Sequence, residues 1–329
     1  MLDTQQIDKA EIFNAIQSLV TNELELVENE LANVQSDVKI INEISSHILR
    51  SGGKRLRPML VLLSAGCFDY HGTKSIKLAS IVEMIHAATL MHDDVIDNSS
   101  KRRSKATANF IWDNKFSILA GDYIYAHSFQ KMTELNSLKI FDILAAVTAY
   151  IVEGEIIQLK QNQDISVTLA DYLQVIDRKT AKLFSVSSQL GAVVAGESLQ
   201  VIQTMEKFGH YFGLAYQMIN DILDYTDNIK ITGKEYAEDL LEGKPTLPLI
   251  KAYECSNTED RSTLKAAFEN NPDISLVEPI IAKTLSIKKS HDYAKTYINK
   301  ARNCLEDIPK STYKSGLLEL CDYLELMPY

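Results

Sequence analysis

Two clusters of acidic side chains carry the clearest chemical signal in this sequence of 329 residues. The first, HDDVID at residues 92–97, ends a long apolar segment. In a helix, residues four positions apart share a face, so the carboxylates of Asp93 and Asp97 are expected one turn apart. Oxygen ligands favour Mg²⁺, which commonly binds one or two carboxylates together with substrate phosphates. The alternative for this cluster alone is a solvated, acidic helix end.

The second cluster is QMINDILD at residues 217–224, and its flanks are almost wholly apolar. Asn220 and Asp224 repeat the four-residue spacing of the first cluster, and Gln217 and Asp221 lie on the same predicted helix face. Two such faces in apolar helices predict opposed walls of a cavity that holds metal ions. The predicted metal ligands are Asp93, Asp94, Asp97, Asn220, Asp221 and Asp224.

Cationic side chains stand in predicted loops next to these clusters. In GGKRLRP, residues 52–58, two glycines precede a basic triplet, which lets backbone and cations approach one anion. The order GxxxxGK[ST] of a P-loop is absent. Each cation alone is more often an exposed surface charge, but next to two metal-binding faces the set predicts a diphosphate held between Mg²⁺ and basic groups. The other cations are Arg102, Arg103, Lys179, Lys234 and Lys244.

Helices must position these groups, because helix breakers are scarce. The sequence has 13 glycines and 7 prolines, and no proline lies between Val61 and Gly243. Apolar residues recur at spacings of three and four, and strict alternation is sustained nowhere, so we expect no strands. The pattern predicts one all-α domain over 1–329, whose first 35 residues form an amphipathic helix that can contact a partner subunit. Breaks are expected at 51–58, 68–74, 97–109, 227–248 and 269–273.

The overall composition excludes other classes of protein. With 34 basic and 44 acidic residues the net charge is −10, which argues against a nucleic-acid-binding domain. The sequence shows no secretory signal and no apolar run of the roughly 18 residues that span a membrane. Its four cysteines are widely separated. We therefore expect a cytoplasmic protein without a transmembrane segment.

Five segments, in this order, resemble the trans-isoprenyl diphosphate synthases: GGKRLRP, HDDVID followed by RR, KTAKLF, YQ…NDILD and GK…EGKPTLP. They cover roughly residues 50 to 250. The segments GDYIYAHSFQKM, SLKIFD, EGEIIQL and RRSKATAN most resemble the octaprenyl diphosphate synthases of bacteria, which make the ubiquinone side chain. The resemblance implies an orthogonal helical bundle with a central cavity, a homodimer and three Mg²⁺ ions per active site.

The resemblance also implies substrates and roles. Isopentenyl diphosphate attacks an allylic cation formed from an allylic diphosphate, here farnesyl diphosphate, and the long product passes to a membrane. Departing pyrophosphate takes the final proton. The residues implied to bind isopentenyl diphosphate are Lys54, Arg57, His86 and Arg103. Those implied to neutralise the allylic diphosphate are Arg102, Lys179, Lys234 and Lys244. Thr180 and Gln217 are implied to offer oxygen dipoles to the cation, and the catalytic set is Lys179, Thr180 and Gln217.

Product length is expected to depend on the helix turn before Asp93, along which the growing tail must run. One turn is about 5.4 Å. Ala88 and Thr89 stand there with small side chains, whereas short-chain members of the family carry an aromatic residue. A medium or long product is therefore expected, with eight units implied by the octaprenyl-like segments. Phe129 and Met132 are the candidates for the tunnel floor.

Two positions depart from the family pattern. Asn220 stands where the family usually has an aspartate, and Ser104 replaces a glycine; we expect weaker binding of the third Mg²⁺. A class I terpene cyclase is one alternative, because its second motif also begins Asn-Asp. Its later ligands, however, fall at Asp224 and Asn228, and it has no use for an isopentenyl site. The other alternative is a non-catalytic subunit of a heteromeric synthase, with Asn220 as an early lesion.

Overall fold

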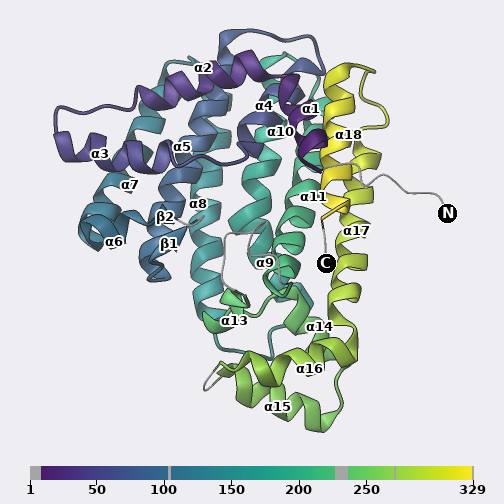
Figure 1. Ribbon diagram of the computed structural model, residues 1–329. Helices are drawn as coiled ribbons and strands as arrows, with labels where there is room; N and C mark the ends of the chain where they lie inside the picture. Colours follow the sequence, from purple (N-terminus) through teal and green to yellow (C-terminus); the bar gives the residue numbers. More distant parts are fainter. Residues whose placement is uncertain (1–8, 103–104, 227–235, 270–271, 328–329) are drawn as a thin grey trace.

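The computed structural model describes residues 9–102, 105–226, 236–269 and 272–327. Over these residues the chain is a bundle of helices (Figure 1). The first half contains α1 Lys9–Ser18, α2 Thr21–Ala32, α3 Lys39–Leu49, α4 Leu56–Gly66, α5 Thr73–Ile96, β1 Lys101–Arg102, β2 Lys105–Ala106, α6 Ala108–Trp112, α7 Asn114–Thr133 and α8 Leu138–Gln161. The second half contains α9 Leu169–Ile176, the π-helix η1 Asp177–Ala181, α10 Lys182–Val194, α11 Leu199–Asp224, α13 Glu238–Leu241, α14 Leu247–Cys255, α15 Thr258–Glu269, α16 Ile274–Thr284, α17 Ser286–Cys304 and α18 Thr312–Glu325.

Helix α5 lies inside the bundle and contacts α2, α4, α7 and α10. Its buried side chains fall on every side of the helix, as the nearly continuous apolar segment predicts. Helix α11 packs against α10 and α17 in the same way. The two acidic clusters therefore lie at the ends of two buried helices, whose packing fixes their positions.

The last helices complete the bundle. Helices α17 and α18 run along one side of it, and α14, α15 and α16 gather at the end next to α13 (Figure 1). This end has its own apolar cluster, which includes Leu240 of α13 and Phe268 of α15. The cluster thus ties the short helix α13 to the rest of the fold.

Two expectations about secondary structure are wrong. The N-terminal segment is two helices rather than one, because α1 ends at Ser18 and α2 begins at Thr21. Both residues place a hydroxyl on a backbone carbonyl, of Ala15 and Gln17 respectively, and such bonds compete with helical geometry. A short antiparallel pair, β1 with β2, also occurs where no strand was expected. Each of its strands has two residues, too few for an alternating pattern to register.

A continuous helical rod runs from α9 through η1 to α10. It begins with a capping box: the hydroxyl of Thr168 accepts a hydrogen bond from the backbone N–H of Asp171, whose carboxylate accepts one from that of Thr168. Such a cap stabilises a helix start by about 1 kcal/mol. The cap fixes the residue at which the rod starts, and so helps to determine which of its side chains face the cavity. None of the described helices combines the length and apolarity that crossing a membrane requires.

Candidate active site

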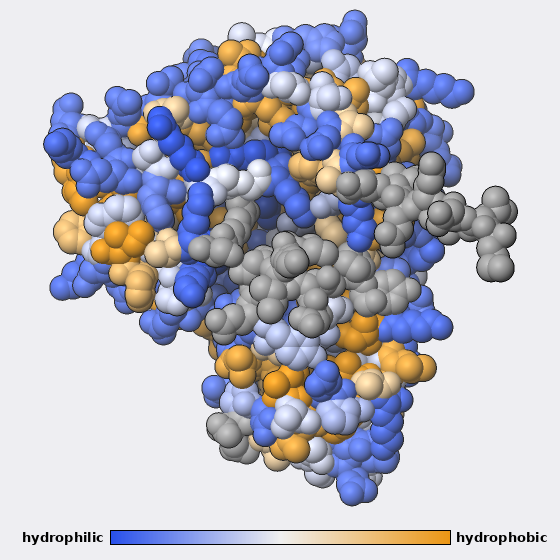
Figure 2. Space-filling view, in the orientation of Figure 1, coloured by the Kyte–Doolittle hydropathy of each residue, from blue (hydrophilic) through white to orange (hydrophobic). Residues whose placement is uncertain are grey.

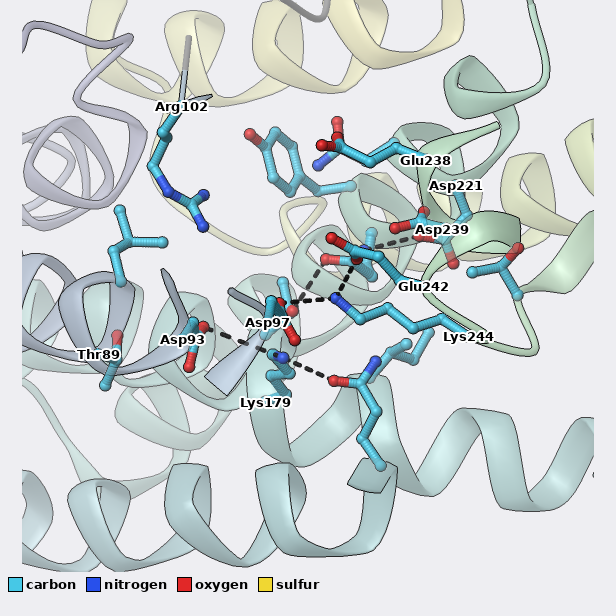
Figure 3. A pocket seen from close by; sticks show the side chains of 18 of the residues that line it. Thr89, Asp93, Asp97, Arg102, Lys179, Asp221, Glu238, Asp239, Glu242 and Lys244 are labelled. Carbon is cyan, nitrogen blue, oxygen red and sulfur yellow. Dashed lines mark hydrogen bonds and ion pairs between the residues drawn. The ribbon is translucent and has the colours of Figure 1, made fainter. Parts of the chain in front are cut away.

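A cavity of about 930 Å³ lies between the ends of α5 and α11. Its walls come from the start of α4, from α5, α8, α9, η1 and α11, and from the segment that contains α13. Figure 3 shows basic side chains pointing toward carboxylates from several of these elements. The sequence predicted a cavity walled by the two acidic clusters, and most of the predicted residues that the structure describes line this one.

Asp93 and Asp97 form the carboxylate wall at the end of α5. The carboxylate of Asp93 lies 4.0 Å from Nζ of Lys179. Burial raises the pKa of Asp93 above its ordinary range, and the positive charge of Lys179 works against that rise. A second cation near Asp93 would therefore favour its ionised form further.

Lys244 faces the same wall from the opposite side of the cavity. Its Nζ donates to Asp97 Oδ2 at 2.8 Å and lies 2.6 Å from Glu242 Oε2 (Figure 3). Burial by itself lowers the pKa of Lys244, but the two carboxylates raise it overall. Lys244 therefore carries a full positive charge inside the cavity, as a diphosphate site requires.

Asp94 points away from this wall. It is only 2 % exposed, and one of its oxygens accepts from both Nε and Nη2 of Arg102 at 2.7 Å. Burial raises the pKa of Asp94, and Arg102 opposes that rise. This geometry does not favour the predicted role of Asp94 as a metal ligand. It favours a structural role, because the pair holds Arg102 at the rim of the cavity (Figure 3).

Lys179 stands on the π-helix η1 and is held by two residues that the sequence analysis missed. Its Nζ lies 2.6 Å from Glu155 Oε2 and donates to Gln158 Oε1 at 2.6 Å. Both partners come from α8, three positions apart on one face. Burial raises the pKa of Glu155, and Lys179 lowers it in part. Glu155 and Gln158 also share a helix face with Ile151, at spacings of four and three, and this pattern is a signal that could have found them.

The second predicted metal cluster divides into three different environments. Asn220 lines the cavity. Asp221 is buried, and its Oδ2 accepts from the hydroxyl of Tyr172 at 2.6 Å. Asp224 is also buried, and its Oδ2 accepts from the backbone N–H of Asp239 at 3.1 Å. The carboxylate of Asp224 thus anchors the segment at the start of α13, which does not favour it as a metal ligand.

Gln217 and Thr180 meet across the cavity wall. The hydroxyl of Thr180 donates to Gln217 Oε1 at 2.9 Å, and Gln217 Nε2 donates to Asp221 Oδ1 at 2.7 Å. The oxygen of Gln217 therefore faces Thr180, so of the two predicted dipoles the geometry favours the one at Thr180. Tyr172, which anchors this chain of hydrogen bonds, is a further cavity residue that the sequence analysis missed.

The basic turn before α4 depends on unusual backbone angles. Gly52 and Gly53 have φ of +83° and +137°, values that glycine adopts without the cost of a Cβ. Arg55 follows at φ +49° and binds Glu28 and Glu83, each at 2.6 Å. These ion pairs anchor the turn, and all three of its cations, Lys54, Arg55 and Arg57, line the cavity.

The predicted isopentenyl site is assembled at this turn. Lys54, Arg57 and His86 all line the cavity. The Arg57 guanidinium lies over the ring of Phe184, with its Cζ 4.2 Å from the ring centroid, a cation–π contact that restrains it. The fourth predicted member, Arg103, lies outside the described residues, as do Lys234, Ser104 and Asn228.

One helix turn before Asp93, Thr89 and its neighbour Leu90 line the cavity, and Ile151 of α8 adds another apolar side chain to the lining. Ala88, by contrast, is fully buried in the core. Of the two predicted length-determining positions, Thr89 is therefore the one at the cavity. The predicted floor residues Phe129 and Met132 belong to α7 and pack in the core; neither is among the described residues that line the cavity.

The donor set fits a hard divalent cation. Carboxylate and amide oxygens line the cavity at Asp93, Asp97 and Asn220, and oxygen ligands of this kind suit Mg²⁺. Lysine nitrogens already face two of these carboxylates. The carboxylates of this wall can therefore pair with Mg²⁺ or with lysine ammonium groups. A diphosphate between the wall and Lys179 and Lys244 would contact both kinds of cation.

Comparisons with known proteins relate this chain to one family. The profile of the polyprenyl synthetase family matches residues 38–284. An octaprenyl diphosphate synthase of Haemophilus influenzae is 39 % identical over 93 % of this chain and 94 % of its own. Component 2 of the heptaprenyl diphosphate synthase of Bacillus subtilis is 37 % identical over 95 % and 90 %. A polyprenyl synthase of Caulobacter crescentus, solved with calcium and isoprenyl diphosphate, superposes with a TM-score of 0.91 at 34 % identity over 96 % of this chain and 98 % of its own.

Proposed function

We propose a specific reaction for this chain, which belongs to the polyprenyl synthetase family and is a trans-polyprenyl diphosphate synthase, a transferase of isoprenoid biosynthesis with the all-α fold of that family. It elongates farnesyl diphosphate with isopentenyl diphosphate to all-trans octaprenyl diphosphate, for the side chain of a quinone. The observation that carries the proposal is one cavity in which two aspartates of α5 face lysines from two other elements.

The first step is ionisation of the allylic diphosphate. Lys179, Lys244 and Arg102 surround the position of the leaving group and neutralise the charge that develops on it. Lys234 is assigned the same role from the sequence. Asp93 and Asp97 would hold Mg²⁺, which would supply further positive charge to the diphosphate. The C–O bond breaks with its electron pair on pyrophosphate, and an allylic cation remains.

The second step forms a carbon–carbon bond. Lys54, Arg57, His86 and Arg103 bind the diphosphate of isopentenyl diphosphate. Its double bond attacks the allylic cation, and loss of one proton to the departed pyrophosphate restores an alkene. The cavity residues therefore neutralise pyrophosphate, direct an oxygen dipole at the allylic cation and exclude water. No side-chain base is assigned.

Product length follows from the apolar end of the cavity. The tail extends past Thr89, whose small side chain leaves the path open. The relatives include octaprenyl, nonaprenyl and heptaprenyl synthases. Eight units is the length that we propose, because the segments of this sequence most resemble the octaprenyl enzymes.

Magnesium is the cofactor of this family, and we assign three ions to each active site with substrate bound. Asp93 and Asp97 would hold two of them. Asn220 and Asp221, which both line the cavity, would hold the third, whereas Asp94 and Asp224 are less favoured ligands because they are not among the described residues that line it. The neutral amide of Asn220 contributes no charge, so it would hold the third ion weakly.

A homodimer is the proposed assembly. Helix α8 exposes Val152, Ile156 and Leu159 at the spacing of one helix face. Apolar residues also gather over α6, at the left of Figure 2, where Phe110 is 68 % exposed. Exposed apolar surface of this extent marks an interaction site, and a second copy of the chain is the proposed occupant.

The decisive experiment uses purified protein alone with farnesyl diphosphate, isopentenyl diphosphate and Mg²⁺. Chromatography of the products is expected to give octaprenyl diphosphate. Products of another length would overturn the chain length but not the activity. A cyclic hydrocarbon would identify a terpene cyclase. No product from the chain alone would favour a partner-dependent subunit, a candidate suggested by the relative named as component 2 of its synthase.

A further inference from the structure

Four cavity residues form one chain of hydrogen bonds. The hydroxyl of Tyr172 donates to Asp221 Oδ2 at 2.6 Å, and Gln217 Nε2 donates to Asp221 Oδ1 at 2.7 Å. The hydroxyl of Thr180 then donates to Gln217 Oε1 at 2.9 Å. The members come from α9, α11 and η1, so the chain joins three elements across one wall of the cavity.

The chemistry of the chain fixes its direction. An ionised carboxylate only accepts hydrogen bonds, so the atom of Gln217 that faces Asp221 must be its NH₂ group. Its Oε1 is then turned to Thr180, and the hydroxyl hydrogen of Thr180 points at Gln217. The lone pairs of the Thr180 oxygen are left toward the cavity, which Thr180 lines.

Tyr172 is placed to hold this arrangement. It is 4 % exposed, so its hydroxyl has little access to water and its bond to Asp221 lies in a region of low dielectric. A tyrosine hydroxyl carries its proton at neutral pH, so Tyr172 is the donor in this bond. Without this bond, the Oδ2 of Asp221 would lose a donor, and the carboxylate could rotate away from Gln217.

We propose that Tyr172 is a positioning residue for ionisation: through Asp221 and Gln217 it directs the oxygen of Thr180 at the carbon that becomes cationic. The inference rests on the proposed prenyl transfer. The oxygen dipole interacts strongly only when positive charge has developed on that carbon, so the chain stabilises the transition state and hardly affects the bound substrate.

The test is a Tyr172→Phe variant, which removes one hydroxyl and keeps the ring. We expect single-turnover formation of the first condensation product to slow about tenfold or more, with KM for both substrates within twofold of wild type. Binding of farnesyl thiolodiphosphate, an analogue that ionises poorly, is expected to stay unchanged. Tyr297→Phe is the matched control, because Tyr297 is also buried, at 9 % exposed, and its hydroxyl bonds to that of Tyr293 in α17, away from the residues that line the cavity.

A double-mutant cycle separates positioning from general loosening. Thr180→Val removes the oxygen that the chain directs, so adding Tyr172→Phe to it is expected to cost less than twofold more. Gln217→Met interrupts the same chain one link further along and should reproduce the slower ionisation if Tyr172→Phe proves too unstable to assay.

Three results would overturn the inference: wild-type rates in Tyr172→Phe, a loss that appears mainly in KM, or independent losses in the double variant. Failure of the proposed function is distinguishable from all three, since it would appear as absence of chain elongation in the wild-type protein.

Discussion

Lys244 and Asp97 lie 147 positions apart in the sequence and are joined by a 2.8 Å hydrogen bond across the cavity. Lys244 owes its place to the turn after α13, where Gly243 has φ +72° and the backbone N–H of Lys244 donates to the carbonyl of Asp239. The first acidic cluster is therefore paired with Lys244, a cation whose position is set by the turn after α13 on the opposite side of the cavity.

Replacing Lys244 by glutamine should strongly lower the rate of catalysis without unfolding the protein. A preorganised cation at the leaving group contributes about 10²–10³ to the rate, so Lys244→Gln is expected to lower kcat/KM for the allylic diphosphate by that factor. Initial rates with excess isopentenyl diphosphate measure it. Lys251→Gln is the control, because Lys251 pairs with Glu254 of its own helix, lies over the ring of Tyr293 and is not among the described residues that line the cavity; equal losses in both variants would refute a specific role.

Glu155 is expected to act through Lys179. Glu155→Gln removes the charge that holds Nζ of Lys179 at 2.6 Å and leaves the side chain the same size. We expect a decrease of about tenfold in kcat/KM, equivalent to about 1.4 kcal/mol. Glu153→Gln, on the exposed part of the same helix, should keep wild-type rates. A fully active Glu155→Gln variant would show that Gln158 suffices to place the lysine.

Asn220 should determine how much Mg²⁺ the enzyme needs. An aspartate at this position adds a charged ligand, so Asn220→Asp is expected to reach half-maximal activity at a lower Mg²⁺ concentration. Calorimetric titration of Mg²⁺ in the presence of a non-hydrolysable diphosphate provides a second measure. Superimposable Mg²⁺ curves for the two proteins would contradict weak binding of the third ion.

Thr89 should control product length. A phenylalanine there extends into the apolar part of the cavity one turn from Asp93, so Thr89→Phe is expected to give shorter products with farnesyl diphosphate as primer. Chromatography of the products measures the shift. Thr89→Ser is the control and should leave the length unchanged. Ala88→Phe is expected instead to destabilise the fold by about 1–3 kcal/mol, because Ala88 is packed in the core.

Acid should weaken the fold partly through His127. Burial, with a contribution from Lys131, lowers the pKa of His127 below its ordinary value. The imidazole of His127 therefore binds a proton more tightly in the unfolded chain than in the folded protein. Its contribution to the free energy of unfolding is fully present above about pH 6.5 and is lost as the pH falls below that value. Urea midpoints at pH 7.5 and 5.5 should differ less in His127→Gln than in wild type. The exposed His71 provides the control variant; an unchanged pH difference in His127→Gln would contradict the assignment.

Local spacing predicted much of the helical architecture and the first acidic wall. The continuous apolar pattern of α5 reports burial on all sides, and the four-residue interval between Asp93 and Asp97 reports a shared face wherever the helix packs. The basic turn at 52–58 was readable because two adjacent glycines before cations have few structural reasons to occur together. These features depend on residues close in sequence.

Relations between distant elements were not readable. Asp94 carries the same side chain as Asp93. Only the position of Arg102 on β1 shows that the carboxylate of Asp94 pairs with a protein group instead of lining the cavity. Tyr172 lies 49 positions from Asp221, and nothing near either residue indicates that they meet. Likewise, the orientation of the Gln217 amide is set by Asp221 and Thr180 together, so no single segment contains the information.

The π-helix η1 has a consequence for how the rod tolerates change. In a regular α-helix, Tyr172 and Thr180 would be about 80° out of phase, since eight residues at 100° each complete two turns and leave that remainder. The wider π turn reduces the offset and brings both hydroxyls to one wall. Deleting one residue from 177–179 would leave an interval of seven residues, which at 100° each in an unbroken α-helix is only about 20° short of two full turns. The π turn therefore lets the rod hold one residue more than a regular α-helix while Thr180 stays on the same wall as Tyr172.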